Sequence, residues 1–324
     1  EAKIIRYIRP VMTPKGYSKT LFRERGLLSW LKHRKDIVGI QSLRAKDHQY
    51  LQEFLSVTEE YTSFEELFQN PPRAEIYMTG SDQVWNLEIT HGFDEFYWGQ
   101  FSHPIETKIA TYGASLKKYW EAEETPKAIK NIKSLYAVST REPELSAYIN
   151  SIDDSINPIV VPDPVFLLAQ DVWAKIASKP HINEPYVLFY QAMDNDHVYN
   201  VAEEIAKKEN KRLVVLSANV NGRNSSISHS ASPTDFIGWI KFADLVVTSS
   251  FHATAFSIIF QKPFYCVNLQ MGHDSRLLDV LKTFGLSDRW INKSDDCQHL
   301  SNFDPADSLQ SLQNIATNFI SSII

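Results

Sequence analysis

The sequence contains very little cysteine, with only Cys266 and Cys297 in 324 residues. Two thiols are too few for a disulfide framework or a cysteine-based zinc site, which favours a reducing compartment. The chain also has no apolar run long enough to span a membrane, and its N-terminus has no signal-peptide pattern. We therefore expect a soluble, cytoplasmic protein.

Glycine is scarce as well, with 11 residues, and neither a Gly-x-Gly-x-x-Gly motif nor a Walker lysine loop is present. Their absence argues against the usual nicotinamide- and ATP-dependent enzymes. There is no Gly-x-Ser-x-Gly elbow, and the histidines lack zinc-ligand spacing. His181 and His197 lie near predicted surface loops, and we interpret them as structural. The net charge of -6 gives no reason to expect nucleic acid as a partner.

Short apolar runs alternate with amphipathic segments along most of the chain. The expected strands are AKIIRYI, AEIYMTG, TKIATYG, SLYAVST, NPIVVPD, PYVLFYQ, KRLVVLSA, ADLVVTS and KPFYCVNL. The expected helices include SFEELFQ, HVYNVAEEIAKKEN, SPTDFIGWIKF and DSRLLDVLKTFG. This alternation predicts βαβ units and an α/β fold with parallel sheets.

The length exceeds that of a usual single core, so we expect two domains, 1–165 and 166–324. Their junction is placed between about Pro164 and Pro185, in a stretch without a clear strand. A C-terminal helix after Asp304, capped by Asp307 or Ser308, is expected to cross back to the first domain.

Polar side chains follow the expected strands where each strand ends. They are Ser81, Asp82 and Gln83; Arg141 and Glu142; Asp163; Ser217; Ser249, Ser250 and His252; and Gln270, His273 and Arg276. In open parallel sheets, ligands bind beyond the carboxyl ends of the strands. The shared position of these residues therefore predicts a binding role for the set.

The stretch VVTSSFHATAFSIIF (246–260) shows this pattern within an apolar run. We interpret it as a buried strand that emerges before a helix begins. Ser249 or Ser250 would cap that helix, and the amides at its start would offer a seat for an anion.

Each of these residues also has a simpler interpretation. A serine pair before a helix is most often only a cap, and Asp82 has the chemistry of an ordinary turn residue. Arg141 and Glu142 could form a surface ion pair of little consequence. Asp163 precedes a proline, which is a common turn setting. Their shared position favours function but names no reaction.

Three stretches, MTGSDQVWN (78–86), AVSTREPELSAYI (137–149) and ADLVVTSSFHATAFSIIFQKPF (243–264), resemble the polysaccharide pyruvyl transferase family. KIATYGASL, VVPDPVFLL and DSRLLDVLKTFGL fall in the family's order, and the resemblance covers about residues 3–289. It implies two Rossmann-like domains facing a cleft, similar to the glycosyltransferase-B architecture. It also implies transfer of the pyruvyl group of phosphoenolpyruvate to a sugar diol, giving a cyclic ketal and phosphate.

The sequence departs from the family pattern in two places. Residues 1–10 resemble the family's second strand, so the first βα unit, with its Asn-Tyr-Gly-type loop, is expected to be missing from this sequence. The glycine that commonly follows the Ser-Phe-His histidine is Ala253 here, a change that could narrow the approach of a phosphate to the backbone.

Under this resemblance, Arg141 holds the donor carboxylate with a bidentate guanidinium. His252 clamps the phosphate or transfers a proton, and Asp82 accepts a proton from the sugar hydroxyl or orients it. The expected substrate-binding residues are Ser81, Gln83, Ser249, Ser250, His273 and Arg276. The acid or base role of His252, and which hydroxyl attacks first, stay open.

The expected partners are phosphoenolpyruvate as co-substrate and a galactose-like or mannosamine-like acceptor on a lipid-linked or nucleotide-linked precursor. A lipid-linked acceptor would bring the protein to the inner face of a membrane as a peripheral enzyme. No step requires a metal or a redox cofactor. Two alternatives stay open: a nucleotide-sugar glycosyltransferase of the same architecture, and an inactive carbohydrate-binding relative.

Overall fold

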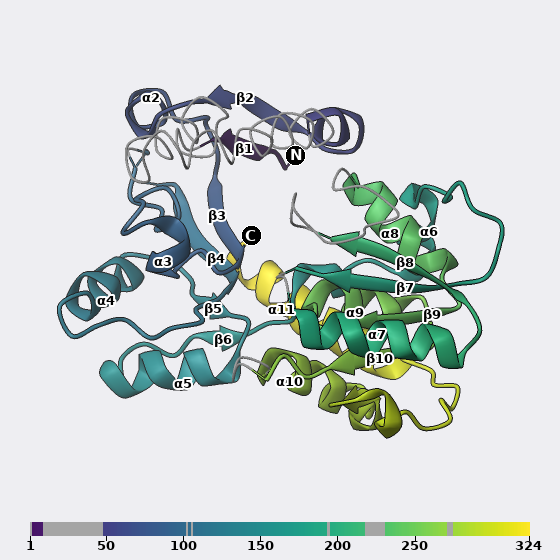
Figure 1. The fold of residues 1–324 in the computed structure, drawn as a ribbon. Coiled ribbons are helices and arrows are strands. Elements are labelled where there is room, and N and C mark those ends of the chain that lie inside the picture. Colours follow the sequence, from purple (N-terminus) through teal and green to yellow (C-terminus); the bar gives the residue numbers. More distant parts are fainter. Residues whose placement is uncertain are drawn as a thin grey trace, which may run out of the picture. The chain divides into compact units, whose positions relative to one another are not determined.

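The structure is a computed structural model that describes residues 2–8, 48–101, 103–104, 106–192, 195–217, 231–270 and 275–324. These residues form two compact units (Figure 1), and the chain passes from one to the other several times, including between Leu167 and Leu168 and between Ser308 and Leu309. A separate two-stranded sheet joins β1 (Ile4–Tyr7) to β2 (Val57–Tyr61).

The β3–β6 unit consists of Ile5–Arg9, Thr58–Leu167 and Leu309–Ile324. Its parallel sheet has the order β3-β4-β5-β6, with β3 (Ile76–Asp82), β4 (Lys108–Ala114), β5 (Ser139–Thr140) and β6 (Ile159–Val160). The helices between these strands are α3 (Leu87–Thr90), α4 (Thr125–Lys133) and α5 (Pro143–Ile152), and α2 (Phe64–Gln69) precedes β3. Six of the seven residues of β4 are buried, as expected for a parallel strand covered on both faces.

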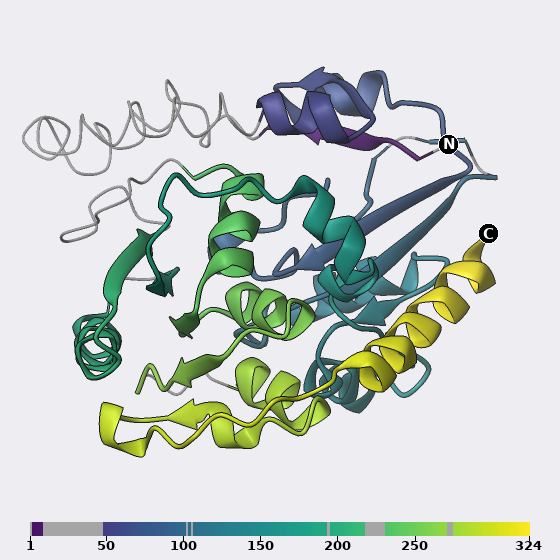
Figure 2. The same ribbon diagram turned by 90° about the vertical axis from the view of Figure 1, so that its right-hand side faces the viewer.

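Helix α11 (Ala306–Ile323) lies along this sheet (Figure 2). It packs there through apolar side chains. Ala316, Phe319 and Ile323 lie in one buried cluster with Ala110, Tyr112 and Val161 of the sheet region. The helix begins at Ala306, whose N–H donates to Asp304 Oδ1 at 3.0 Å. Asp307 and Ser308 therefore lie inside the helix, and the prediction that one of them caps it is wrong.

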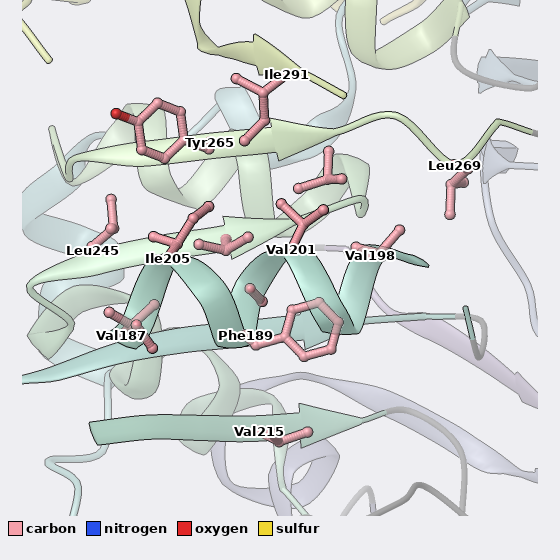
Figure 3. Close-up of a cluster of buried hydrophobic side chains, with 14 residues drawn as sticks. Val187, Phe189, Val198, Val201, Ile205, Val215, Leu245, Tyr265, Leu269 and Ile291 are labelled. Atoms are coloured by element: carbon pink, nitrogen blue, oxygen red, sulfur yellow. The ribbon is translucent and has the colours of Figure 1, made fainter. Parts of the chain in front are cut away.

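The β7–β11 unit is formed mainly by Leu168–Ser308. Its parallel sheet has the order β11-β10-β9-β7-β8, with β7 (Tyr186–Gln191), β8 (Arg212–Ser217), β9 (Leu245–Thr248), β10 (Phe264–Val267) and β11 (Trp290–Ile291). The helices are α6 (Gln170–Ile176), α7 (Asp196–Lys208), α8 (Pro233–Phe242), α9 (Phe251–Ile259) and α10 (Ser275–Thr283). The apolar face of α7, with Val198, Val201 and Ile205, covers the strands (Figure 3).

The direction of the chain reverses between β7 and β9. From β7 the chain passes through α7 to β8 on one side, and it then returns to β9 on the other side of β7. Right-handed crossovers place α7 and α9 on opposite faces of the sheet. In open α/β sheets, ligands bind beyond the carboxyl ends of the strands at such a reversal, which here are the ends of β7 and β9.

The prediction of an α/β fold with two parallel-sheet units is confirmed, and every expected strand has a counterpart in the structure. The short strands β2 and β11 are additional. Among the helices that the structure describes, none is long and apolar enough to cross a membrane.

Candidate functional site

A buried arginine organises the carboxyl edge of the β3–β6 sheet. Arg141, the residue after β5, donates from Nε to Glu142 Oε1 (3.1 Å), from Nη1 to Asp163 Oδ2 (2.5 Å) and from Nη2 to Asp82 Oδ1 (3.1 Å). Nη2 also donates to Ser115 Oγ at 3.2 Å. The Arg141 side chain is only 5% exposed, so the simpler interpretation of a surface ion pair does not apply.

The three carboxyl groups determine the electrostatics of this edge. Burial alone would lower the pKa of Arg141, but Glu142, Asp163 and Asp82 outweigh burial and hold that pKa above its ordinary value. Three carboxyl groups against one guanidinium leave an excess of negative charge. A donor carboxylate could take the bidentate position on Arg141 only by displacing one of these groups.

The Ser-Asp-Gln-Val-Trp-Asn stretch holds Asp82 in an exposed position. Ser81 Oγ donates to Gly113 O of the neighbouring strand, and Gln83 Oε1 accepts from Asn86 Nδ2 at 2.7 Å. Trp85 is fully buried. By contrast, the Asp82 side chain is 64% exposed. Most of the motif therefore supports the local structure, whereas the carboxyl group of Asp82 is exposed.

Gly80 explains how the end of β3 turns toward this position. Its φ is +116°, and a Cβ at this residue would lie 2.2 Å from Tyr112 O of β4. Any side chain would therefore collide with the backbone of the adjacent strand. The next turn residue, Asp82, itself has a φ of 67°.

Glu142 is a second carboxyl group with acceptor capacity at this edge. Its Oε1 accepts from Ser115 Oγ at 2.8 Å and from Arg141, whereas its buried Oε2 has no hydrogen-bond partner among the described residues. A buried acceptor of this kind is costly unless a hydroxyl or a water reaches it. The sequence marked Glu142 only as a polar strand-end residue, because nothing in its local pattern reveals the unpaired oxygen.

The carboxyl edge of the β7–β11 sheet carries the Ser-Phe-His stretch at the start of α9. Ser250 is the N-cap of this helix, and its Oγ accepts from the N–H of Ala253. His252 lies in the first turn and is exposed, and that turn has no acidic residue. The partial positive charge at the N-terminus of a helix is an environment that favours an anion. The partly buried Ser249 lies at the same strand end.

Gln191 is a further polar residue at the carboxyl ends of β7 and β9. Tyr190 pairs with Thr248 in the sheet, so Gln191, the last residue of β7, lies beside Ser249, the residue that follows β9. Its side chain is buried in an otherwise apolar strand. Gln191 was not among the predicted site residues. The feature of the sequence that could have revealed it is a glutamine at the end of the apolar run YVLFYQ.

The remaining predicted residues of this unit lie on other elements. Arg276 lies in the first turn of α10 and is partly buried, and His273 lies outside the described residues. His197, in the first turn of α7, is in hydrogen-bond contact with Gln270 at 3.2 Å. Within the described ranges, no three His, Cys, Asp or Glu side chains are grouped so that they could hold a metal ion.

Comparison with known proteins shows which family the chain belongs to. The solved structure of S. aureus MnaA with UDP is similar with 10% sequence identity and a TM-score of 0.45, over 99% of this chain and 90% of that one. At this score the resemblance is weak. No curated protein matches significantly. The sequence profile described as polysaccharide pyruvyl transferase matches residues 44–270, which is more than half of the chain. The chain belongs to the polysaccharide pyruvyl transferase family.

Proposed function

We propose that this protein transfers the pyruvyl group of phosphoenolpyruvate to two hydroxyls of one sugar in a polysaccharide precursor. Protonation of the methylene carbon creates an oxocarbenium-like centre, and a sugar hydroxyl adds to it. Phosphate leaves, and the neighbouring hydroxyl closes the cyclic ketal. The expected acceptor is a galactose-like or mannosamine-like residue, and its carrier is a lipid or a nucleotide.

The observation that carries this proposal is the difference in charge between the carboxyl edges of the two sheets. The edge around Asp82 has an excess of carboxyl groups, which repels a phosphorylated carboxylate and suits a neutral acceptor. The edge at α9 offers His252 and a helix N-terminus without an acid in its first turn, which suits the phosphate. We therefore assign the acceptor to the β3–β6 unit and the donor phosphate to the β7–β11 unit.

Asp82 is the group proposed to accept the proton of the attacking hydroxyl. It is exposed, and its Oδ1 is held by Arg141 Nη2 at 3.1 Å. An exposed carboxylate in this position can accept the proton of a hydroxyl. We therefore assign Arg141 a positioning role, because its guanidinium is already engaged at all three nitrogens. Glu142 Oε2 is available to accept from the second hydroxyl.

His252 is the group proposed to bind the phosphate and exchange a proton with the donor. Histidine changes its charge near neutral pH, so the same ring can donate a proton or hold an anion. Ser249 and Ser250 contribute hydroxyls beside the helix start. A proton-transfer role of this kind is typically worth about a hundredfold to ten-thousandfold in rate.

The test is phosphate release from phosphoenolpyruvate with a panel of galactose-, mannose- and N-acetylmannosamine-terminated acceptors, followed by mass spectrometry of the sugar product. We expect phosphate release only when donor and acceptor are both present, with a pyruvyl increment on the acceptor. A glycosyl increment from a nucleotide sugar would contradict the proposal, as would no reaction with any acceptor.

A further inference from the structure

Two stacked tyrosines, one exposed and one half-buried, lie in the β3–β6 unit, which also contains the acidic cluster around Arg141. Tyr119 is 48% exposed, and its ring stacks on that of Tyr148 with centroids 4.0 Å apart and planes 9° from parallel. Tyr148 belongs to α5, the helix that follows Arg141. Tyr119 lies in the loop that follows the carboxyl end of β4.

The two tyrosine rings are held in place because they pack on a cluster of buried tryptophan side chains. Tyr148 packs on Trp120 with centroids 5.7 Å apart, and Trp120 packs in turn on Trp85 and Trp98. Trp120 Nε1 donates to Trp85 O at 3.2 Å. Tyr119 is thus the outermost ring of a series that extends from the core to the solvent. An aromatic ring that is already ordered loses little conformational freedom when a ligand stacks on it.

The position of Tyr119 relates it to the acceptor side of the proposed reaction. Ser115, four residues earlier in the same loop, bonds both Arg141 and Glu142. Four residues of chain span at most about 14 Å, so the platform lies within this distance of the cluster's serine. The other exposed aromatic residues in the described part of this unit are Phe68 and Tyr136. Neither is in the loop after β4, because Phe68 lies in α2 and Tyr136 precedes β5.

We propose that Tyr119, supported by Tyr148, is a platform for a sugar of the acceptor glycan beyond the residue that reacts. The apolar C–H face of a hexose packs on an aromatic ring, while the phenol hydroxyl at its rim can bond a sugar hydroxyl. This inference rests on the proposed placement of the acceptor at the Asp82 edge. It predicts that longer glycans bind more tightly than the terminal sugar alone.

The experiment measures glycan binding without phosphoenolpyruvate, by isothermal titration. The probes are matched pairs of a methyl glycoside and a tetrasaccharide, ending in galactose, mannose or N-acetylmannosamine. For at least one pair we expect the wild type to bind the tetrasaccharide about tenfold more tightly than the methyl glycoside. Tyr119→Ala should lose that gain and Tyr119→Phe should keep most of it. Tyr136→Ala is the matched control, since it removes an exposed tyrosine before β5.

The absence of a length-dependent gain in every pair would overturn the proposal, as would a gain that Tyr119→Ala retains or Tyr136→Ala also loses. Thermal unfolding of each variant separates a binding defect from a folding defect. A length-dependent gain that requires Tyr119, without phosphate release from phosphoenolpyruvate, would preserve the platform and reject the pyruvyl transfer reaction. Phosphate release from phosphoenolpyruvate without a length-dependent gain in binding would support the pyruvyl transfer reaction and reject the platform.

Discussion

Arg141 and Asp163 form an ion pair that is buried on both sides, with Nη1 and Oδ2 2.5 Å apart and each side chain 5% exposed. Asp163 also accepts the N–H of Val165 through Oδ1, at the start of the turn Pro164–Phe166. The pair therefore connects the strand end at Arg141 to the turn that follows β6. The same guanidinium holds the exposed Asp82, so the stability of this unit and the placement of its proposed base depend on one side chain.

Removal of Arg141 should destabilise the β3–β6 unit strongly. Arg141→Ala leaves Asp163 buried without its cation, and breaking a buried pair in this way costs about 3–5 kcal/mol in free energy of unfolding. Urea unfolding followed by tryptophan fluorescence measures the loss. The control is Lys133→Ala, which breaks the more exposed pair with Asp153 and should destabilise the protein much less. Similar losses for both variants would contradict the role given to the buried pair.

Arg141→Lys separates a positioning role from a direct grip on the donor. Lysine keeps the charge but cannot reach three carboxyl groups with a planar fork. If Arg141 positions Asp82, Arg141→Lys should lower kcat in the same direction as Asp82→Asn, with little change in the KM for phosphoenolpyruvate. A selective rise in that KM would instead support the bidentate contact with the donor carboxylate that the family resemblance implies.

The sequence predicted where the strands end better than it predicted the side-chain contacts at those ends. Apolar runs such as LVVTS and IVVPD mark strand ends because the hydrophobic pattern breaks where the backbone leaves the sheet. Ser250 was one of two residues expected to cap α9, and the structure identifies it as the cap. The sequence could not show that Arg141 bonds carboxyl groups 22 and 59 residues away, because these contacts depend on how the chain folds. The exposed stack of Tyr119 on Tyr148 was missed for the same reason.

Cys266 should make the stability of the β7–β11 unit depend on pH in alkaline solution. The thiol is fully buried in β10, and burial raises its pKa from 9.0 to about 12. The folded protein thus retains a proton that the unfolded chain releases above pH 9, so stability falls as the pH rises from 9 toward 12. Urea unfolding of the wild type and Cys266→Ala at several pH values measures the difference, in which the other titrating groups cancel. If the difference in free energy of unfolding between the wild type and Cys266→Ala does not shrink as the pH rises, the prediction for this buried thiol is contradicted.

Substitution of His252 is the most direct test of the proposed binding of phosphoenolpyruvate at the start of α9. Its ring is exposed in the first turn of α9, so His252→Ala removes no buried group and should leave the melting temperature nearly unchanged. If the imidazole exchanges a proton or holds the phosphate, turnover should fall by at least about a hundredfold. His181→Ala removes an exposed histidine before β7 and should retain normal turnover. A folded His252→Ala protein with near-normal turnover would take the imidazole out of the mechanism and leave this turn as a capped helix start.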